Sequence, residues 1–389
     1  INGADVEGTV NNLGINHMDA IIKESGIKAV LSGRLKGIPD KAKMSADADI
    51  DDIAFTTRGL EQFLKVWGKN MNLELGKYAR DGRFNFSGMT SGRIDDNTQS
   101  VSIAGKIITD NLDIGGIAGI SPVGKCSMHG SLKADLGKGN TSVEVDTVFI
   151  DRLRILGYDY SRIIGAGKLS QNSFDGRIIC SDPNLNFIFQ GIFSLSDKTR
   201  NGVYKFMANV GYADLYALKL DKRGVSKVSG RVNANYMTVK RGDIIGDIDI
   251  SEIHLENKDG RKAIGNVSVK SHSNENIHRV NFSSDFADAS FVGNKAMIDM
   301  VKDIEELTLG RNIPALLESG RKGWKGERYD VNIDFHDSRD LMKFALPGMY
   351  IADSTKAILK VDANGVLTAF VSSPRIAWMR NSAKDFSLH

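Results

Sequence analysis

The sequence predicts a mainly β protein: an elongated, repeating β-groove in which a curled, taco-like sheet has an apolar inner face and carries a few short helices. Apolar and polar residues alternate in many short runs, as they do in strands, where successive side chains point to opposite faces. Glycine is abundant, at 40 residues, and proline is scarce, at 6. Only a few segments show helical spacing, so helices cannot cover the whole sheet.

The clearest run is 185–196, LNFIFQGIFSLS. Its odd-numbered positions are leucine, phenylalanine or glycine, and its even-numbered positions are mixed. This pattern predicts a long strand with one apolar face. Gly191 lies in the middle of that face, where a glycine commonly marks a bend or a close approach of another backbone.

The first half of the chain repeats this pattern. Alternating runs predict strands at 27–37, 44–50, 84–88, 101–107, 126–136 and 143–145. Apolar residues at helical spacing predict an amphipathic helix over 58–69. A short helical or irregular piece is expected over 151–158.

The second half is denser. Strands are predicted at 163–169, 174–180, 185–196, 204–210, 228–236, 244–250, 263–269, 280–286, 329–335, 357–361 and 367–371. Slips in phase near Asp214 and Glu252 predict bulges. Helices are predicted over 296–309 and over 337–346, the latter capped by Asp337 or Ser338. Roughly seventeen strands in one ribbon would span on the order of 80 Å.

Composition limits the function classes. The 51 basic and 48 acidic side chains give a formal net charge of +3. This charge lacks the strong basic excess that is typical of nucleic-acid-binding proteins. No apolar run approaches the length needed to cross a bilayer. The chain starts at Ile1 rather than Met, so we expect a processed product or an excised segment. Cys126 and Cys180 are expected to be separate, unpaired, buried thiols.

No catalytic, cofactor or metal motif stands out, so no enzyme is predicted. The segment 119–126, GISPVGKC, is one residue short of a P-loop and runs into a strand. The segment 165–170 lacks the third glycine of a dinucleotide fingerprint. The acidic run at 47–52 lacks the glycine and final glutamate of a calcium loop, so a solvated strand face is the interpretation.

The apolar face of such a sheet must be covered, and three architectures achieve this: a sandwich, a solenoid, or a trough with an apolar lining. The frequent glycines favour the trough. Its predicted lining consists of Leu185, Phe187, Phe189, Phe193, Leu195, Phe206, Val228, Val232, Ile248 and Phe282. We expect one extended segment over 1–389, with a possible subdivision into 1–150, 151–295 and 296–389.

Three stretches resemble the TamB family, the translocation and assembly module of Bacteroidetes-type bacteria. They are GYDYSRIIGAGKLSQNSFDGRIICSDPNLNFIFQGIFSLS from 157, NFSSDFADASFVG over 281–293 and DSRDLMKFALPGMYIAD over 337–353. The resemblance covers about 157–354. It implies an internal, periplasmic segment of an AsmA-like envelope protein, without the inner-membrane anchor and the terminal domain.

Members of that family are thought to conduct phospholipids between the inner and outer membranes and to support outer-membrane biogenesis with a barrel partner (BamA- or TamA-like). An apolar trough suits this role, because exposing the roughly 30 methylenes of a diacyl lipid to water costs about 24 kcal/mol. Two alternatives stay open: a scaffold that assembles outer-membrane strands by β-augmentation, and a solenoid or sandwich adhesin with a sealed core. A glycan-active enzyme is the weakest alternative, since no paired carboxylates stand out.

Overall fold

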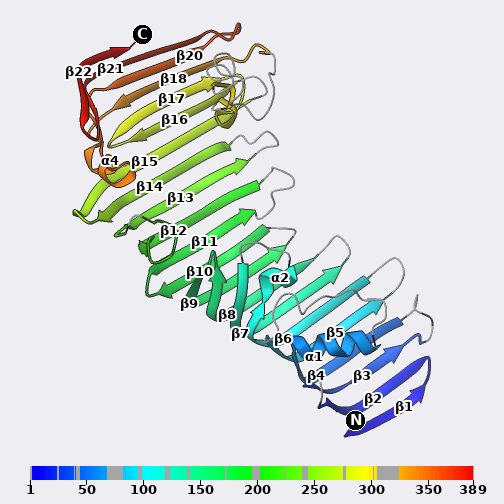
Figure 1. Cartoon of the computed structure of the whole chain (residues 1–389). Coiled ribbons are helices and arrows are strands. Elements are labelled where there is room, and N and C mark those ends of the chain that lie inside the picture. The colour runs from blue at the N-terminus through cyan, green and yellow to red at the C-terminus, as the bar shows by residue number, and fades with distance from the viewer. Residues whose placement is uncertain are drawn as a thin grey trace. The chain divides into compact units, whose positions relative to one another are not determined.

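In the described part of the chain, twenty-two strands form one antiparallel sheet that is not closed, which confirms the mainly β fold (Figure 1). The computed structural model describes residues 2–23, 26–38, 40, 44–67, 82–94, 99–118, 123–137, 141–170, 173–194, 202–222, 224–238, 244–274, 277–300, 302–304 and 324–388. The chain divides into two compact units, unit 1 (Ile1–Ile188) and unit 2 (Phe189–His389).

Unit 1 is an antiparallel meander in which each strand pairs with the next along the chain. Its strands are β1 (Gly3–Thr9), β2 (Asn12–Ile22), β3 (Ile27–Lys36), β4 (Met44–Thr56), β5 (Arg83–Ile94), β6 (Gln99–Asp113), β7 (Val123–Gly137), β8 (Ser142–Ile155), β9 (Tyr158–Ser170) and β10 (Ser173–Asp182). Helix α1 (Thr57–Trp67) follows β4, and α2 (Ile114–Ala118) lies next to β7.

Strand β11 (Leu185–Ser194) spans the boundary between the units. Unit 2 continues with β12 (Gly202–Asp214), β13 (Lys227–Thr238), β14 (Ile244–Asn257), β15 (Gly260–Ser273), β16 (His278–Ser284), β17 (Ala287–Gly293), β18 (Tyr329–Phe335), α4 (Arg339–Ala345), β19 (Met349–Ile351), β20 (Lys356–Val361), β21 (Leu367–Trp378) and β22 (Asn381–Leu388). From β12 to β18 each strand pairs with its successor; β18 then pairs with β20, and β21 lies between β20 and β22. The short β19 also pairs with β21.

Register separates the side chains into two faces in each unit. In unit 1 one face, here called the apolar face, carries a cross-strand row of Ile103, Ala134, Val143, Leu169 and Phe174. The opposite face, here called the polar face, carries the neighbouring row of Lys133, Glu144, Lys168 and Asp175. Charges of opposite sign therefore stand side by side on the polar face, where such cross-strand pairs stabilise a sheet.

Glycine permits a close strand approach on the apolar face at Gly191. Its φ is +139°, and a Cβ there would lie 2.2 Å from the Lys205 carbonyl oxygen and 2.8 Å from Cβ of Phe206. Only glycine adopts this backbone without strain. The prediction of a bend or close approach at this glycine is confirmed.

Several predicted elements are confirmed. The helix expected over 58–69 is α1, although residues 68 and 69 lie outside the described part. The helix expected over 337–346 is α4, with Ser338 as its N-cap residue but without a side-chain capping bond. Residues 297–300 and 302–304 are helical, and the rest of the helix expected to 309 lies outside the described residues. The strand register shifts near Asp214, and Glu252 has a φ of +54°, so both predicted bulges are present.

Other expectations were wrong. The described part of the chain has twenty-two strands rather than roughly seventeen, because no strand was predicted at β1, β2, β17, β19 or β22. The piece expected to be helical or irregular over 151–158 is instead the end of β8, a turn at Leu156 and Gly157, and the start of β9. The short helix α2 was not predicted.

Candidate functional site

The predicted phase of β11 is correct. Asn186, Ile188 and Gln190 are exposed, whereas the residues between them are half-buried or buried. Leu195 lies outside the described residues. Phe189 is buried. The eight remaining predicted lining residues are half-buried: Leu185, Phe187, Phe193, Phe206, Val228, Val232, Ile248 and Phe282.

Phe189 differs from its neighbours because it is only 6% exposed. Its ring centroid lies 5.3 Å from that of Phe193 and 5.2 Å from that of Phe206. These contacts fix an aromatic cluster in the floor of the apolar face, so Phe189 packs the sheet and offers little free surface.

In unit 2 the register joins predicted and unpredicted residues into one continuous apolar row, here called row C. Each member is the direct cross-strand partner of the next, and no member is polar. Row C runs through Phe206, Ala234, Ile248, Val269, Phe282, Ala289, Ile333, Ala357, Val371 and Leu388. The nine intervals between these ten strands, at about 4.8 Å each, make the row roughly 43 Å long.

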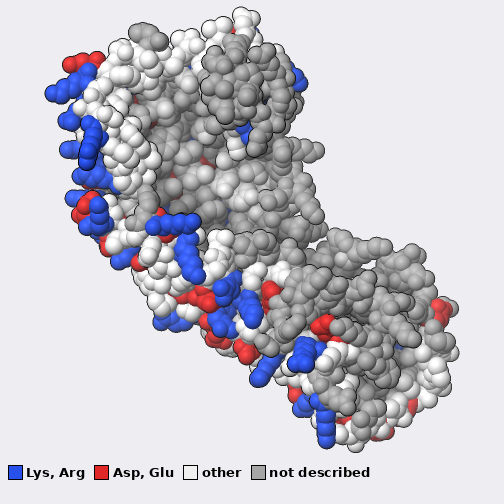
Figure 2. Space-filling model, viewed as in Figure 1, with Lys and Arg blue, Asp and Glu red and all other residues white. Residues whose placement is uncertain are grey.

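Row C is lined on both sides by further rows of the same face. Tyr204 and Tyr236 stack at 4.7 Å between ring centroids in the row on one side, and Val232 lies in the row on the other. Most of these side chains keep part of their surface exposed, which a sealed core would not allow. Figure 2 shows unit 2 hollowed on the viewed face, with Lys and Arg gathered along one border of the hollow.

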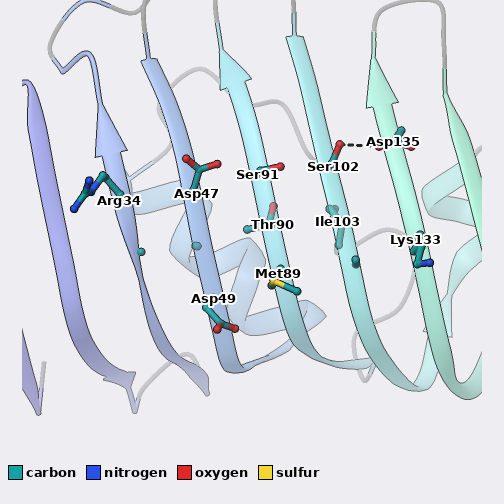
Figure 3. A pocket seen from close by; sticks show the side chains of 13 residues that line it. Arg34, Asp47, Asp49, Met89, Thr90, Ser91, Ser102, Ile103, Lys133 and Asp135 are labelled. Atoms are coloured by element: carbon teal, nitrogen blue, oxygen red, sulfur yellow. Dashed lines mark hydrogen bonds between the residues drawn. The ribbon is translucent and has the colours of Figure 1, made fainter.

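The polar face of unit 1 offers a different, shallow site. A hollow of about 640 Å³ lies over β3 to β7, lined among others by Arg34, Asp47, Ser91, Ser102 and Asp135 (Figure 3). Ser102 donates a hydrogen bond of 2.6 Å to Asp135. The hollow mixes both charge signs along a row of direct cross-strand partners, as expected of a solvated sheet surface.

The polar face of unit 2 is similar. Lys356 pairs with Asp334 at 3.4 Å, and Lys360 pairs with Asp330 at 3.3 Å. His336 approaches Asp288 at 3.0 Å, and hydrogen bonds from Ser283 and His336 lower the pKa of that carboxyl. These exposed pairs hold neighbouring strands in register and add little stability individually.

A small cap covers part of the apolar face in unit 2. Phe291, Tyr329 and Val361 are at most 3% exposed. Among the described residues, the side chains packed against them from outside the sheet are Met300 and Ile304 of the helical segment and Trp324. We call residues 295–300, 302–304 and 324–328 the cap.

Charged groups anchor the cap. Lys295 Nζ lies 2.7 Å from Glu327 and 3.2 Å from Asp303, and Tyr329 donates a hydrogen bond to Asp303. Burial disfavours the charge on Lys295, but its hydrogen bonds to both carboxylates outweigh burial and raise its pKa. Burial also opposes ionisation of Glu327, yet the hydrogen bond from Lys295 lowers its pKa overall. The side-chain oxygen Oδ1 of Asn294 also holds the cap by accepting a 2.7 Å hydrogen bond from the backbone N–H of Arg328.

The sequence motifs considered for chemistry lie on strands β4, β7, β9 and β10, as far as they are described. Cys126 and Cys180 are free, buried thiols, as expected. The acidic residues at 47, 49 and 51 are exposed on β4, and Asp52 pairs with Lys28 at 2.8 Å. Of the P-loop-like stretch, 119–122 lie outside the described residues and the remainder belongs to β7. In the described part of the chain no group of acidic, histidine or cysteine side chains could hold a metal ion, and no helix is long and apolar enough to cross a membrane.

Sequence reasoning missed the small members of row C and the contacts that hold the cap on the sheet. Ala234, Ala289 and Ala357 carry only a methyl group and gave no strong signal, although each lies in phase with larger apolar neighbours. Lys295, Asp303 and Glu327 are spread over 33 positions of the sequence, and only the folded backbone brings them together.

Comparisons with known proteins add no identity: no protein-family model, curated protein or solved structure matches this chain.

Proposed function

We propose that this chain is a periplasmic, TamB/AsmA-like segment that conducts phospholipids between the inner and outer membranes, with acyl chains on its apolar face and headgroups in water. The observation that carries the proposal is row C: ten strands that neighbour one another in the ladder carry apolar side chains in direct register, without one polar member. An outer-membrane barrel partner and an inner-membrane anchor outside this chain belong to the same proposal.

The physical argument concerns what such a face can hold. Interior strands use their backbone N–H and C=O groups in the ladders on both sides, so the face offers no hydrogen-bond partners there. An extended peptide lying on it would lose hydration without compensation. An alkyl chain has no polar groups to satisfy and gains about 0.8 kcal/mol for each methylene that leaves water. Because the contacts along the row are uniform and weak, an alkyl chain can move along it without being held at one strong binding site.

Native mass spectrometry of the purified chain tests the proposal, with the expectation of co-purified phospholipid. The variant Val232→Glu, which puts a carboxylate on the apolar face, should lose most of that lipid. The matched control is Asn235→Glu on the same strand; Asn235 is exposed on the opposite face, between Lys205 and Asp247. Parent protein free of lipid after mild purification, and unable to take lipid from vesicles, would refute conduction.

A further inference from the structure

A second hollow of unit 2, here called the α4 pocket, lies where helix α4 approaches the turn between β14 and β15. Its volume is about 410 Å³, which is within the range of small-ligand sites. Three segments that are far apart in the sequence line it: residues 225–226, the turn 257–259, and residues 343–344 and 347–348 in and after α4. Helix α4 lies in Figure 1 at the border of unit 2 along which Figure 2 shows Lys and Arg gathered.

The α4 pocket presents charges of both signs. Lys258 and Lys343 supply two ammonium groups, and Asp259 supplies one carboxylate. All three residues are exposed, and neither Lys258 nor Asp259 has an ion-pair partner among the described residues. Lys343 Nζ lies 3.7 Å from Asp340, in an exposed and therefore weak pair. The charged groups of the pocket are thus available to a ligand.

This set of charges complements a zwitterion better than a simple ion. Lysine ammonium groups donate hydrogen bonds to phosphate oxygens, and a carboxylate accepts them from an ammonium group. A ligand with only a phosphate would stand beside the like charge of Asp259, and a ligand with only a cation would stand beside two lysines. A phosphate ester that carries a primary ammonium group satisfies all three side chains. A quaternary ammonium has no N–H to donate to the carboxylate.

The α4 pocket also adjoins the apolar face. Val228 pairs with Leu255 on that face, and Ser226 and Asn257 of the pocket lie two residues further towards the strand ends. From Val228 to Ala234 of row C, strand β13 spans six residues, or roughly 20 Å. The hydrocarbon core of a bilayer is about 30 Å thick, so the acyl chains of one leaflet span about 15 Å. A lipid with its headgroup in the pocket therefore lays its acyl chains along β13 towards row C.

We infer that the α4 pocket binds the headgroup of phospholipids that carry both a phosphate and a primary ammonium group, as phosphatidylethanolamine does. Lys258 and Lys343 bind the phosphate, and Asp259 binds the ammonium group. This inference rests on the proposed function and assigns a headgroup class to the conducted lipid. Because each contact is exposed and weak, the pocket selects the lipid without holding it tightly.

Native mass spectrometry of the chain with equal amounts of dioleoyl-phosphatidylethanolamine, dioleoyl-phosphatidylglycerol and dioleoyl-phosphatidylcholine tests the selectivity. The acyl chains are identical, so only the headgroups differ. The parent protein should bind the ethanolamine lipid roughly three- to fivefold better than either of the others, a factor at the upper end for one exposed ion pair. Asp259→Asn should abolish this preference. Asp249→Asn, at an exposed position on the polar face of β14, is the control that should retain it.

The double variant Lys258→Met/Lys343→Met tests the phosphate contacts. It should weaken the binding of all three lipids by roughly threefold or more, because each of them carries a phosphate. Lys205→Met, which removes an exposed lysine from the polar face of β12, is its control and should bind lipid as the parent does.

Carbodiimide crosslinking locates the headgroup. The reagent joins a carboxylate to a primary amine in contact with it, and the adduct is mapped by peptide mass spectrometry. The ethanolamine lipid should form an amide with Asp259 in the parent protein. The choline lipid, which has no primary amine, should form none.

A soluble headgroup distinguishes a lipid site from a site for small phosphate esters. Glycerophosphoethanolamine has the same charged groups without acyl chains, so it should bind at least about tenfold more weakly than the lipid. Equal affinity for the two would assign the pocket to soluble phosphate esters and overturn its role in lipid binding.

The remaining outcomes separate the two proposals. Equal binding of the three lipids by the parent protein overturns the headgroup assignment and leaves the proposed function standing. An unchanged preference in Asp259→Asn, or a lipid adduct only at other carboxylates, does the same. A parent protein that binds none of the lipids overturns both proposals.

Discussion

A charge placed at Val232 distinguishes an open apolar face from a sealed core, because it lowers the free energy of unfolding by different amounts in the two architectures. Val232 is half-buried, and its direct cross-strand neighbours are Ala208 and Ile250. Full burial of a valine contributes roughly 1.5–3 kcal/mol, so its loss here removes about 1 kcal/mol. The poorer strand preference of glutamate adds at most about another 1 kcal/mol.

Val232→Glu should therefore destabilise unit 2 by about 1–2 kcal/mol, which lowers the melting temperature by about 2–8 °C for a unit of this size. In a sealed core the same carboxylate would have no access to water and would cost several kcal/mol. Thermal unfolding followed by circular dichroism measures the difference, with Asn235→Glu as the control expected to change stability by less than about 0.5 kcal/mol.

The reasoning is refuted if Val232→Glu fails to fold, or melts more than about 15 °C below the parent while Asn235→Glu is unchanged. Such a result would mean that the apolar face is covered in solution, as the sealed-core alternative requires. Phe189→Asp does not make this distinction, because Phe189 is buried among aromatic rings and a charge there is costly in either architecture.

Three further results are expected. Gly191→Ala should destabilise unit 2 by about 2 kcal/mol or more in urea unfolding, because the backbone is strained and the new Cβ meets Lys205, whereas Gly230→Ala, which has room for a Cβ, should be nearly neutral. Because the pKa of Glu327 is lowered, its stabilisation of the cap is complete above about pH 4.5 and is lost as the pH falls through its folded-state pKa. Hydrogen exchange of residues 324–329 should therefore increase at acidic pH and stay unchanged between about pH 6 and 8. Burial raises the pKa of Cys126 to about 11, so iodoacetamide at pH 8 should modify this thiol only after denaturation, and rapid labelling of the native protein would contradict the structure.

The sequence predicts strand phase well where one face is apolar over a whole strand. In β11 the alternation alone identifies the residues that face inward, and the slip at Glu252 correctly indicates a bulge. Strands β1 and β22 escaped prediction because they lie at or near the ends of the described sheet and are mostly exposed, so their residues need not alternate. In β2 a register shift between Ile15 and Met18 disrupts the period.

The position of the cap on the sheet could not be predicted from the sequence. The helical spacing around 296–309 predicts a helix with an apolar side, but it does not say which rows of the sheet that side covers. Placement depends on Lys295 meeting Glu327, 32 residues away in sequence, and on Trp324 packing against the buried cluster that contains Tyr329. Such long-range contacts depend on strand order and register together.

Row C also has a consequence for how the protein tolerates change. Under the proposed conduction its ten positions would act in series, so movement of an acyl chain along the row would be as slow as its least favourable step. One carboxylate at Ile248 should slow passage as effectively as one at Ala357, although the two lie on strands far apart in the ladder order. Exchange of one aliphatic side chain for another should leave the rate nearly unchanged, and additional hairpins would lengthen the path without altering its width.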